Sequence, residues 1–168
     1  DGGSELFTNI SCHLTGGWTG LVGPNGVGKT TLLDVVRGNR EPTSGAVHLE
    51  PDGATVGWCP QRVETVTDAI EEFARTWTGT AMRWKSLLEL DDEPISRWSS
   101  LSPGVRKRWQ VGACLYREHP LVLLDEPTNH LDRPARKLLV EALEQFDGTG
   151  FVVAHDRDFL DELCEQIL

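Results

Sequence analysis

The stretch GPNGVGKT at residues 23–30 decides the fold that this sequence predicts. It fits the pattern GxxxxGK followed by Ser or Thr, and it stands between an apolar run at 18–22 and a helix-forming segment at 28–37. That strand–loop–helix setting is what a phosphate-binding loop requires. Glycines let the backbone curl so that successive N–H groups point at phosphate oxygens. A glycine-rich turn with a chance lysine is the alternative, and the setting argues against it.

Side chains of this loop add to the phosphate chemistry of its backbone. Lys29 can bridge the β- and γ-phosphates of a nucleotide, and the hydroxyl of Thr30 can bind Mg²⁺. Thr31 can donate a further hydrogen bond to a phosphate oxygen. The residues that we expect to bind the nucleotide are Gly23, Pro24, Asn25, Gly26, Val27, Gly28, Lys29, Thr30 and Thr31.

The rest of the chain alternates short apolar runs with helical segments. We predict strands at 6–14, 18–22, 46–50, 55–59, 121–124 and 151–154. We predict helices at 28–37, at 65–92 with an interruption near 78–80, from just after 104 to near 118, and at 134–146. Such alternation predicts an α/β fold, a mainly parallel sheet flanked by helices, with ligand bound beyond the carboxyl ends of the strands. No linker or internal repeat divides the 168 residues, so we expect one domain.

Two acids follow the apolar run LVLL at 121–124. At the tip of a buried strand that faces the phosphate loop, Asp125 can hold Mg²⁺ through water. Glu126 points differently and can orient or deprotonate an attacking water. Acids also stand at strand ends merely because the chain emerges into solvent, so this pair gains its meaning from the phosphate loop.

The charge distribution limits the partners of the domain. A net charge of −10 argues against a broad grip on nucleic acid, which needs a basic face. Residues 103–120 are nevertheless basic, with Arg106, Lys107, Arg108 and Arg117 against Glu118. This segment indicates either a local anion-binding edge or a helix with a solvated basic face.

Cysteine usage and hydropathy indicate the compartment. The four cysteines, Cys12, Cys59, Cys114 and Cys164, are far apart, which predicts buried small side chains in a reducing compartment. No run approaches the roughly 18 apolar residues of a membrane-spanning helix. We therefore expect a cytoplasmic domain that does not insert into a membrane.

Further motifs carry a family resemblance. LSPGV at 101–105 precedes the basic helix, DEPTNHLD occupies 125–132, and Gln61 and His155 each follow an apolar strand. Together with the phosphate loop, these segments resemble in order the motifs of ABC ATPases: the Q-loop at Gln61, the signature loop, the Walker B to D-loop stretch, and the switch histidine. NHLD at 129–132 and HDRDFL at 155–160 are similar to the forms typical of ABC-F proteins, paired-domain cytoplasmic ATPases that act on the ribosome.

The resemblance implies an ABC-type P-loop NTPase domain that binds and hydrolyses ATP with Mg²⁺. It implies a nucleotide-binding core at 1–61 and 120–168, with a small antiparallel β part, and a helical signature subdomain at 62–119. The implied catalytic residues are Glu126, His155, Gln61 and Lys29, and the implied Mg²⁺ ligands are Thr30, Gln61 and Asp125. Ser102, Gly104 and Asp132 would act in trans, on ATP held by a second ABC domain of the same polypeptide or of a homodimer.

Three functions stay open at this point. The first is an ABC-F factor that acts on the ribosome or tRNA through a longer protein, in which ATP closes the pair and hydrolysis reopens it. The second is the motor domain of a membrane transporter. The third is a nucleotide-binding switch with little turnover.

Two features depart from the family pattern. Pro103 replaces the first glycine of the signature and Val105 its Gln or Glu. Proline has no N–H, so a charge-assisted bond worth roughly 1.5–3 kcal/mol is missing, and we expect a weakened site on the partner domain. Phe7 is expected in the core, which leaves no aromatic residue assigned to stack on adenine. An ABC-F protein would carry a second ABC domain and a linker, so we expect the chain to be a fragment.

Overall fold

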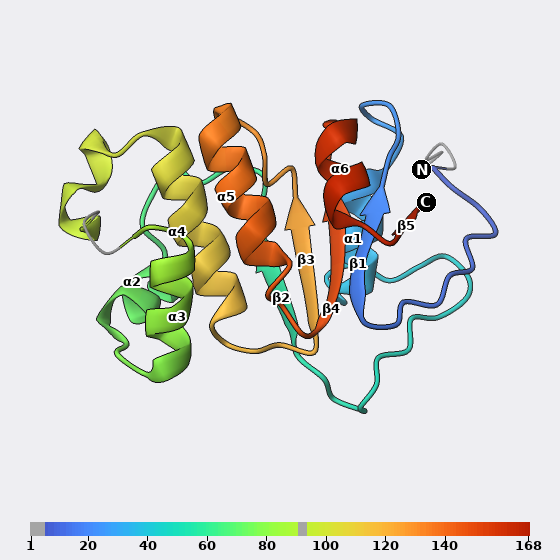
Figure 1. Cartoon of the computed structure of the whole chain (residues 1–168). Coiled ribbons are helices and arrows are strands. Elements are labelled where there is room, and N and C mark those ends of the chain that lie inside the picture. Colours follow the sequence, from blue (N-terminus) through green and yellow to red (C-terminus); the bar gives the residue numbers. More distant parts are fainter. Residues whose placement is uncertain (1–5, 91–93) are drawn as a thin grey trace.

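A five-stranded parallel sheet forms the centre of the molecule in the computed structural model, which describes residues 6–90 and 94–168 (Figure 1). The strands are β1 (Gly17–Leu21), β2 (Val56–Cys59), β3 (Leu121–Asp125), β4 (Thr149–Val153) and β5 (Gln166–Ile167), in the spatial order β2-β3-β4-β1-β5. All neighbouring strands pair in parallel, and Leu21 and Asp125 are both in register with Val153. The last residues of β1, β3 and β4 therefore meet at one edge, which confirms the predicted α/β class.

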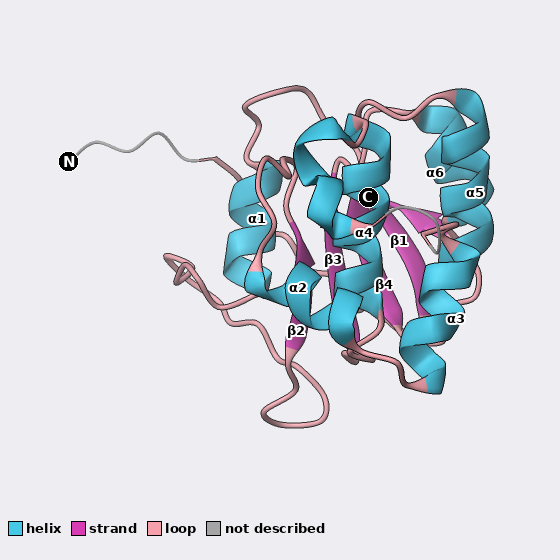
Figure 2. Cartoon of the chain, turned by 90° about the vertical axis from the view of Figure 1, so that its left-hand side faces the viewer, coloured by secondary structure: helices cyan, strands magenta, loops and turns pink. Residues whose placement is uncertain are grey.

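Helices cover both faces of this sheet. They are α1 (Lys29–Val36), α2 (Asp68–Arg75), α3 (Gly79–Leu87), α4 (Pro103–Leu115), α5 (Arg133–Leu143) and α6 (Arg157–Leu163), with a 3₁₀ helix, η1 (Ile95–Ser100). Figure 2 shows the sheet between α1 on one side and α5 and α6 on the other.

The side chains of β3 show how the sheet packs between a layer of helices on each face. Leu121 and Leu123 belong to the apolar cluster that contains Leu33 of α1. Val122 and Leu124 point to the opposite face and join the larger cluster with α4, α5 and α6. All five residues of β3 are buried, as expected for a parallel strand covered on both faces. This rigid centre fixes the position of the acids that follow β3.

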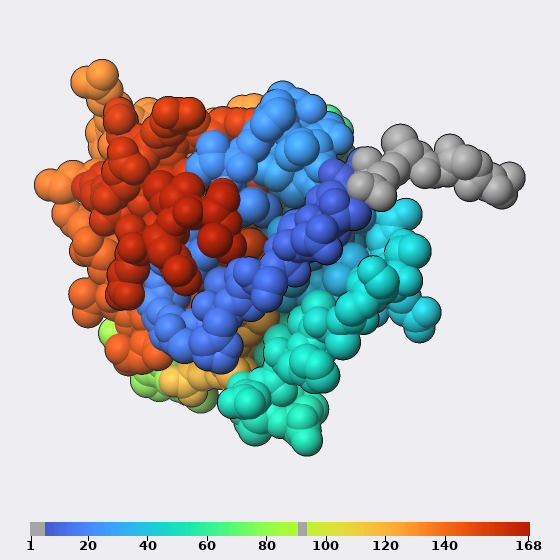
Figure 3. Space-filling model, turned by 90° about the vertical axis from the view of Figure 1, so that its right-hand side faces the viewer, coloured from blue at the N-terminus to red at the C-terminus, as the bar shows by residue number. Residues whose placement is uncertain are grey.

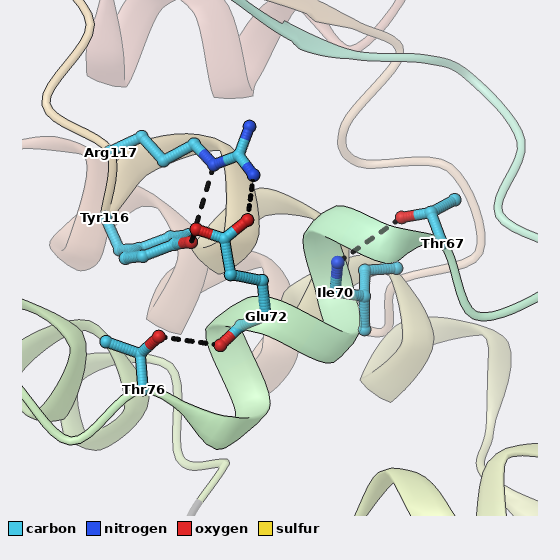
Figure 4. A network of polar contacts seen from close by, with 6 residues as sticks. All are labelled: Thr67, Ile70, Glu72, Thr76, Tyr116 and Arg117. Carbon is cyan, nitrogen blue, oxygen red and sulfur yellow. Dashed lines mark hydrogen bonds and ion pairs between the residues drawn. The ribbon is translucent and has the colours of Figure 1, made fainter.

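A polar network joins α2 to the end of α4 (Figure 4). Thr67 caps α2 by accepting a hydrogen bond from the N–H of Ile70. Glu72 accepts from the hydroxyl of Tyr116 at 2.7 Å and pairs with Arg117. These hydrogen bonds, first that from Tyr116, lower the pKa of the Glu72 carboxyl. The helices between β2 and β3 are thus joined by their polar surfaces as well as by their core.

Two predicted strands are loops in the structure. Residues 6–14 and 46–50 form no ladder, and most of their side chains are exposed. Figure 3 shows both segments running over the surface of one face, blue for the first and cyan to teal for the second. Among the described residues the five strands pair only in parallel, so the small antiparallel part that we expected is not formed there. A short apolar run does not make a strand without a neighbour to share the backbone hydrogen bonds.

Phe7 is not a core residue, which corrects the prediction. It is partly buried, and it lies against the phosphate loop, where a Cβ added to Gly28 would come within 3.2 Å of its ring. The helix α6 and the strand β5 were not predicted. Asp156 provides the missed signal for α6, because its carboxylate accepts a hydrogen bond from the N–H of Phe159 and caps the helix.

The cations of the basic segment at 106–108 contact backbone carbonyls, whereas Arg117 is exposed and pairs with Glu72. Arg106 donates to the carbonyl oxygens of Trp98 and Ser99, and Arg108 donates to that of Leu88. Lys107 is only 2% exposed. These cations are directed at backbone carbonyls inside the chain.

Two of the four cysteines are buried, as predicted. Cys59 and Cys114 are buried and Cys164 is half-buried, whereas Cys12 is exposed. Burial raises the pKa of the Cys59 thiol to about 11. Over residues 6–90 and 94–168, every helix is too short or too polar to cross a bilayer.

Candidate nucleotide-binding site

The phosphate loop connects the end of β1 to the start of α1. Gly26 and Gly28 have φ values of +79° and +106°, which side chains of L-residues rarely adopt. The carbonyl of Gly28 accepts a hydrogen bond from the N–H of Leu32 at 2.8 Å and begins α1. The ammonium of Lys29 donates to the carbonyl oxygens of Gly23 at 2.7 Å and of Pro24 at 3.0 Å. Lys29 therefore joins the start of α1 to the first residues of the loop.

Thr30 and Asp125 join the loop to the end of β3. The Thr30 hydroxyl donates to Oδ2 of Asp125 at 3.0 Å, and Asp125 is only 4% exposed. Burial raises the pKa of the Asp125 carboxyl, while the hydrogen bond from Thr30 and the charges of Lys107 and Lys29 oppose that shift. A hydroxyl and a carboxylate from elements 95 residues apart thus lie in contact.

Glu126 and His155 form the second polar contact of the site. The backbone of Glu126 has φ +49° and is held by a hydrogen bond from its N–H to the carbonyl of Val153 at 2.8 Å. Its Oε2 accepts from the backbone N–H of His155 at 3.3 Å, and its Oε1 lies 3.2 Å from Nε2 of the same residue. That second approach lacks the alignment of a hydrogen bond, so Oε1 stays buried without a hydrogen-bond partner.

Burial raises the pKa of the Glu126 carboxyl, and the nearby His155 opposes the shift. Nε2 of His155 also lies 2.7 Å from Oδ1 of Asn25, so the histidine bridges the phosphate loop and Glu126. A buried carboxyl that has a raised pKa and an oxygen without a hydrogen-bond donor is suited to accept a proton from water.

An open cleft of about 440 Å³ collects these groups. It is lined by Leu6, Asn25, Gly26, Gly28, Lys29, Thr30, Thr31, Gln61, Asp125, Glu126, Asn129 and His155. The structure thus brings together most of the residues expected to bind ATP or act on it, whereas Gly23, Pro24 and Val27 do not line the cleft. Asn129 and Leu6 were not predicted to line it. Asn129 comes back to the cleft because its N–H donates to the carbonyl of Glu126 at 3.3 Å in a tight turn.

The residues expected to act in trans lie outside this cleft. Ser102 caps α4, accepting from the N–H of Val105 at 3.2 Å, and Pro103 is the first helical residue. Asp132 caps α5 by accepting from the N–H of Ala135 at 2.9 Å. Gly104 packs closely on the segment before Asp132, because an added Cβ would lie 3.2 Å from the Leu131 side chain. The signature and D-loop segments therefore lie side by side.

The side-chain oxygens of the cleft are suited to bind a magnesium ion that is also bound by phosphate. Thr30 and Asp125 offer hard oxygen ligands, and Glu126 lines the same cleft. Over the described ranges, no group of three or more His, Cys, Asp or Glu could hold a metal ion by itself. Mg²⁺ commonly combines one or two protein oxygens with those of a bound nucleotide, which suits this arrangement.

A parallel sheet between helices, a curled glycine loop and acids at the adjoining strand end define the class, a P-loop nucleotide-binding domain. A family model described as "ABC transporter" matches residues 7–129. The chain belongs to this family of ABC ATPase domains, which bind ATP.

Known relatives point to the ABC-F branch. The chain is 34% identical to "Ribosome protection protein VmlR" of Bacillus subtilis, over 96% of this chain and 30% of that protein. It is 32% identical to "ABC transporter F family member 2" of Arabidopsis thaliana, over 88% of this chain and 23% of that protein. The chain spans less than a third of the length of these curated relatives. The resemblance to ABC-F proteins is thus confirmed at the level of sequence similarity.

A solved structure confirms the fold. The dimeric structure of an ATP-binding cassette in a post-hydrolysis state, bound to ADP and Pi, matches with a TM-score of 0.76. The match covers 100% of this chain and 89% of that chain at 21% identity.

Proposed function

We propose that the chain hydrolyses ATP in the presence of Mg²⁺, as one half of an ATP-dependent pair of ABC domains. The observation that carries the proposal is the joint approach of Thr30 to Asp125 and of Glu126 to His155 around one cleft beside the phosphate loop.

The residues of the loop bind the triphosphate. Lys29 exchanges its bonds to the carbonyls of Gly23 and Pro24 for bonds to β- and γ-phosphate oxygens. Backbone N–H groups at the start of α1 point at the same phosphates. Thr30, Asp125 and Gln61 would hold Mg²⁺, which neutralises charge on the phosphates when it is bound.

Glu126 orients the attacking water and accepts its proton. The water oxygen forms a bond to the γ-phosphorus, and the bond from that phosphorus to the β–γ bridging oxygen breaks, leaving ADP and phosphate. Burial of Glu126 raises its pKa, so the carboxylate is a stronger base than an exposed one. His155 donates a hydrogen bond to the γ-phosphate and holds it in place, on the side of the cleft where it already meets Asn25.

A second ABC domain completes the site. Ser102, Gly104 and Asp132 lie outside the cleft of their own chain, which supports a role for them toward ATP on a partner domain. We propose that the chain is part of a longer cytoplasmic ABC-F factor that acts on the ribosome or tRNA. The similarity to a ribosome protection protein supports this role.

Substitution of Glu126 by Gln tests both the proposed hydrolysis of ATP and the proposed ATP-dependent pairing. The variant keeps the size of the side chain and one acceptor oxygen but cannot take a proton. We expect unchanged ATP binding, loss of phosphate release, and an ATP-dependent pair that persists in light scattering. Equal slow turnover of the wild-type and variant chains would instead identify a nucleotide switch.

Ribosome co-sedimentation tests the partner. The longer protein with Glu126→Gln should pellet with ribosomes when ATP is present, because its closed pair cannot reopen. A protein that stays in the supernatant and binds a membrane subunit would be a transporter motor.

A further inference from the structure

Four backbone carbonyls of the segment 60–64 accept hydrogen bonds from side chains of the signature segment, residues 98–110. The bonds run from Lys107 Nζ to the oxygens of Pro60 (2.9 Å) and Gln61 (2.8 Å), from Gln110 Nε2 to that of Arg62 (3.3 Å), and from Trp98 Nε1 to that of Glu64 (3.1 Å). Side chains of one segment thus bind the main chain of the other almost residue by residue.

Lys107 is the centre of this arrangement. Its ammonium is buried and donates a third hydrogen bond, to Oε1 of Gln110, at 2.8 Å. All three N–H donors of the ammonium are therefore used inside the chain. A buried lysine is costly unless its charge and its donors are satisfied, so each of these contacts restricts where the helix can lie relative to residues 60–62.

Both ends of this connection are exposed. Gln61 is exposed and lines the cleft for the nucleotide. Ser102 is exposed at the N-terminus of α4, and Lys107 and Gln110 follow it on the same helix, three residues apart and therefore on one face. These bonds connect the main chain at Gln61 to α4, and Ser102 stands at the start of that helix.

We infer that Lys107 is a positioning residue that couples the backbone of Gln61 to the signature loop, with Gln110 and Trp98 as secondary contacts. The inference rests on the proposed function and assigns the coupling to particular side chains. Lys107 does not line the cleft for the nucleotide. It makes the position of Ser102, which serves the partner site, depend on the position of Gln61, which serves the chain's own site.

A second buried lysine provides a matched control. Lys85 in α3 is 4% exposed, and its ammonium donates to the carbonyl oxygens of Ala74 at 2.9 Å and Thr76 at 2.8 Å. Both of these bonds lie in the connection of α2 to α3, away from residues 60–64. Lys85 therefore repeats the chemistry of Lys107 without its connection to the cleft.

Turnover and pairing of Lys107→Met and Lys85→Met separate coupling from stability. Methionine keeps the length of the lysine side chain and removes the donors. We expect Lys107→Met to keep the Kd for ATP within about threefold while kcat and ATP-dependent pairing fall about 10- to 100-fold, the range typical of lost supporting contacts. Lys85→Met should lower thermal stability and leave kcat of the folded chain unchanged.

Trp98→Phe is a milder variant that keeps an aromatic ring and removes one donor. It should lower kcat about two- to tenfold at unchanged Kd for ATP, the effect of one hydrogen bond. This variant decides the matter if Lys107→Met does not fold. Unchanged kcat and pairing in Trp98→Phe and in folded Lys107→Met, or an equal loss in Lys85→Met, would overturn the coupling. Failure of the wild-type chain to turn over ATP would instead count against the proposed function.

Discussion

The cleft and the signature loop contrast in how their polar groups are satisfied. In the cleft, Lys29 and Thr30 already bond within the chain, and Asp125 and Glu126 are each 4% exposed. The tip of the signature loop, Ser102 and Pro103, faces solvent. Buried groups that hold one another are arranged before the ligand arrives, whereas an exposed helix start gains its full set of contacts only from outside. The polar groups of the cleft are therefore held by the fold of the chain itself, whereas those at the start of α4 remain open to a partner.

Removal of the Lys29 ammonium should weaken the binding of ATP in the cleft. Lys29→Ala loses at least two charge-assisted hydrogen bonds to phosphate oxygens, each worth roughly 1.5–3 kcal/mol, so ATP affinity should fall by more than about 100-fold. Isothermal titration of the chain with ATP and Mg²⁺ measures the change. Lys137→Ala, which removes an exposed lysine on α5, is the control. Equal affinities of the two variants would show that ATP does not use this cleft.

The success of sequence reasoning differs between these regions for a physical reason. The phosphate loop could be predicted because its glycines, its lysine and its flanking elements are local in the chain. The pairing of Thr30 with Asp125 could also be predicted, because parallel strands bring their carboxyl ends to the same edge. Local chemistry and one topological rule sufficed for the cleft.

The contacts of Lys107 could not be found in this way. A lysine in a basic helix is usually solvated, and only the folded chain shows the carbonyls of Pro60 and Gln61 at its ammonium. The strands predicted at 6–14 and 46–50 are wrong for a related reason. A local apolar run does not reveal whether a neighbouring strand exists. Long-range partners of backbone groups leave no local signal.

A backbone N–H restored at residue 103 should strengthen ATP-dependent pairing through the signature loop. Pro103 fits its own helix well, because the first helical position needs no N–H within the chain. The missing donor therefore matters only toward a nucleotide on the partner domain. Pro103→Gly should tighten ATP-dependent pairing about tenfold, one charge-assisted bond less the cost of a flexible glycine.

Pro103→Ala separates the donor from flexibility. Alanine restores the N–H while its Cβ occupies the place of the proline Cβ, so both variants should tighten pairing in analytical ultracentrifugation with ATP and the Glu126→Gln background. Tightening by glycine alone would indicate flexibility rather than the N–H. No change in either variant would mean that the signature loop does not need this donor.

The smallest expected effect is a change in thermal stability that arises from the buried carboxylate of Glu126. Burial raises the pKa of Glu126 above its unfolded value of about 4.3, so the folded chain carries an unfavourable carboxylate at neutral pH. Below the unfolded pKa the group is protonated in both states and this cost is absent. Glu126→Gln should therefore raise Tm by a few degrees at neutral pH without nucleotide, and the gain should shrink as the pH falls through the raised pKa.

Thermal unfolding at pH 7.5 and pH 4.5 measures this change in Tm, with exposed Glu144→Gln as the control for lost negative charge. A gain that grew toward acid pH would mean that the Glu126 charge stabilises the empty cleft, and the raised pKa would then be no argument for its role as a base.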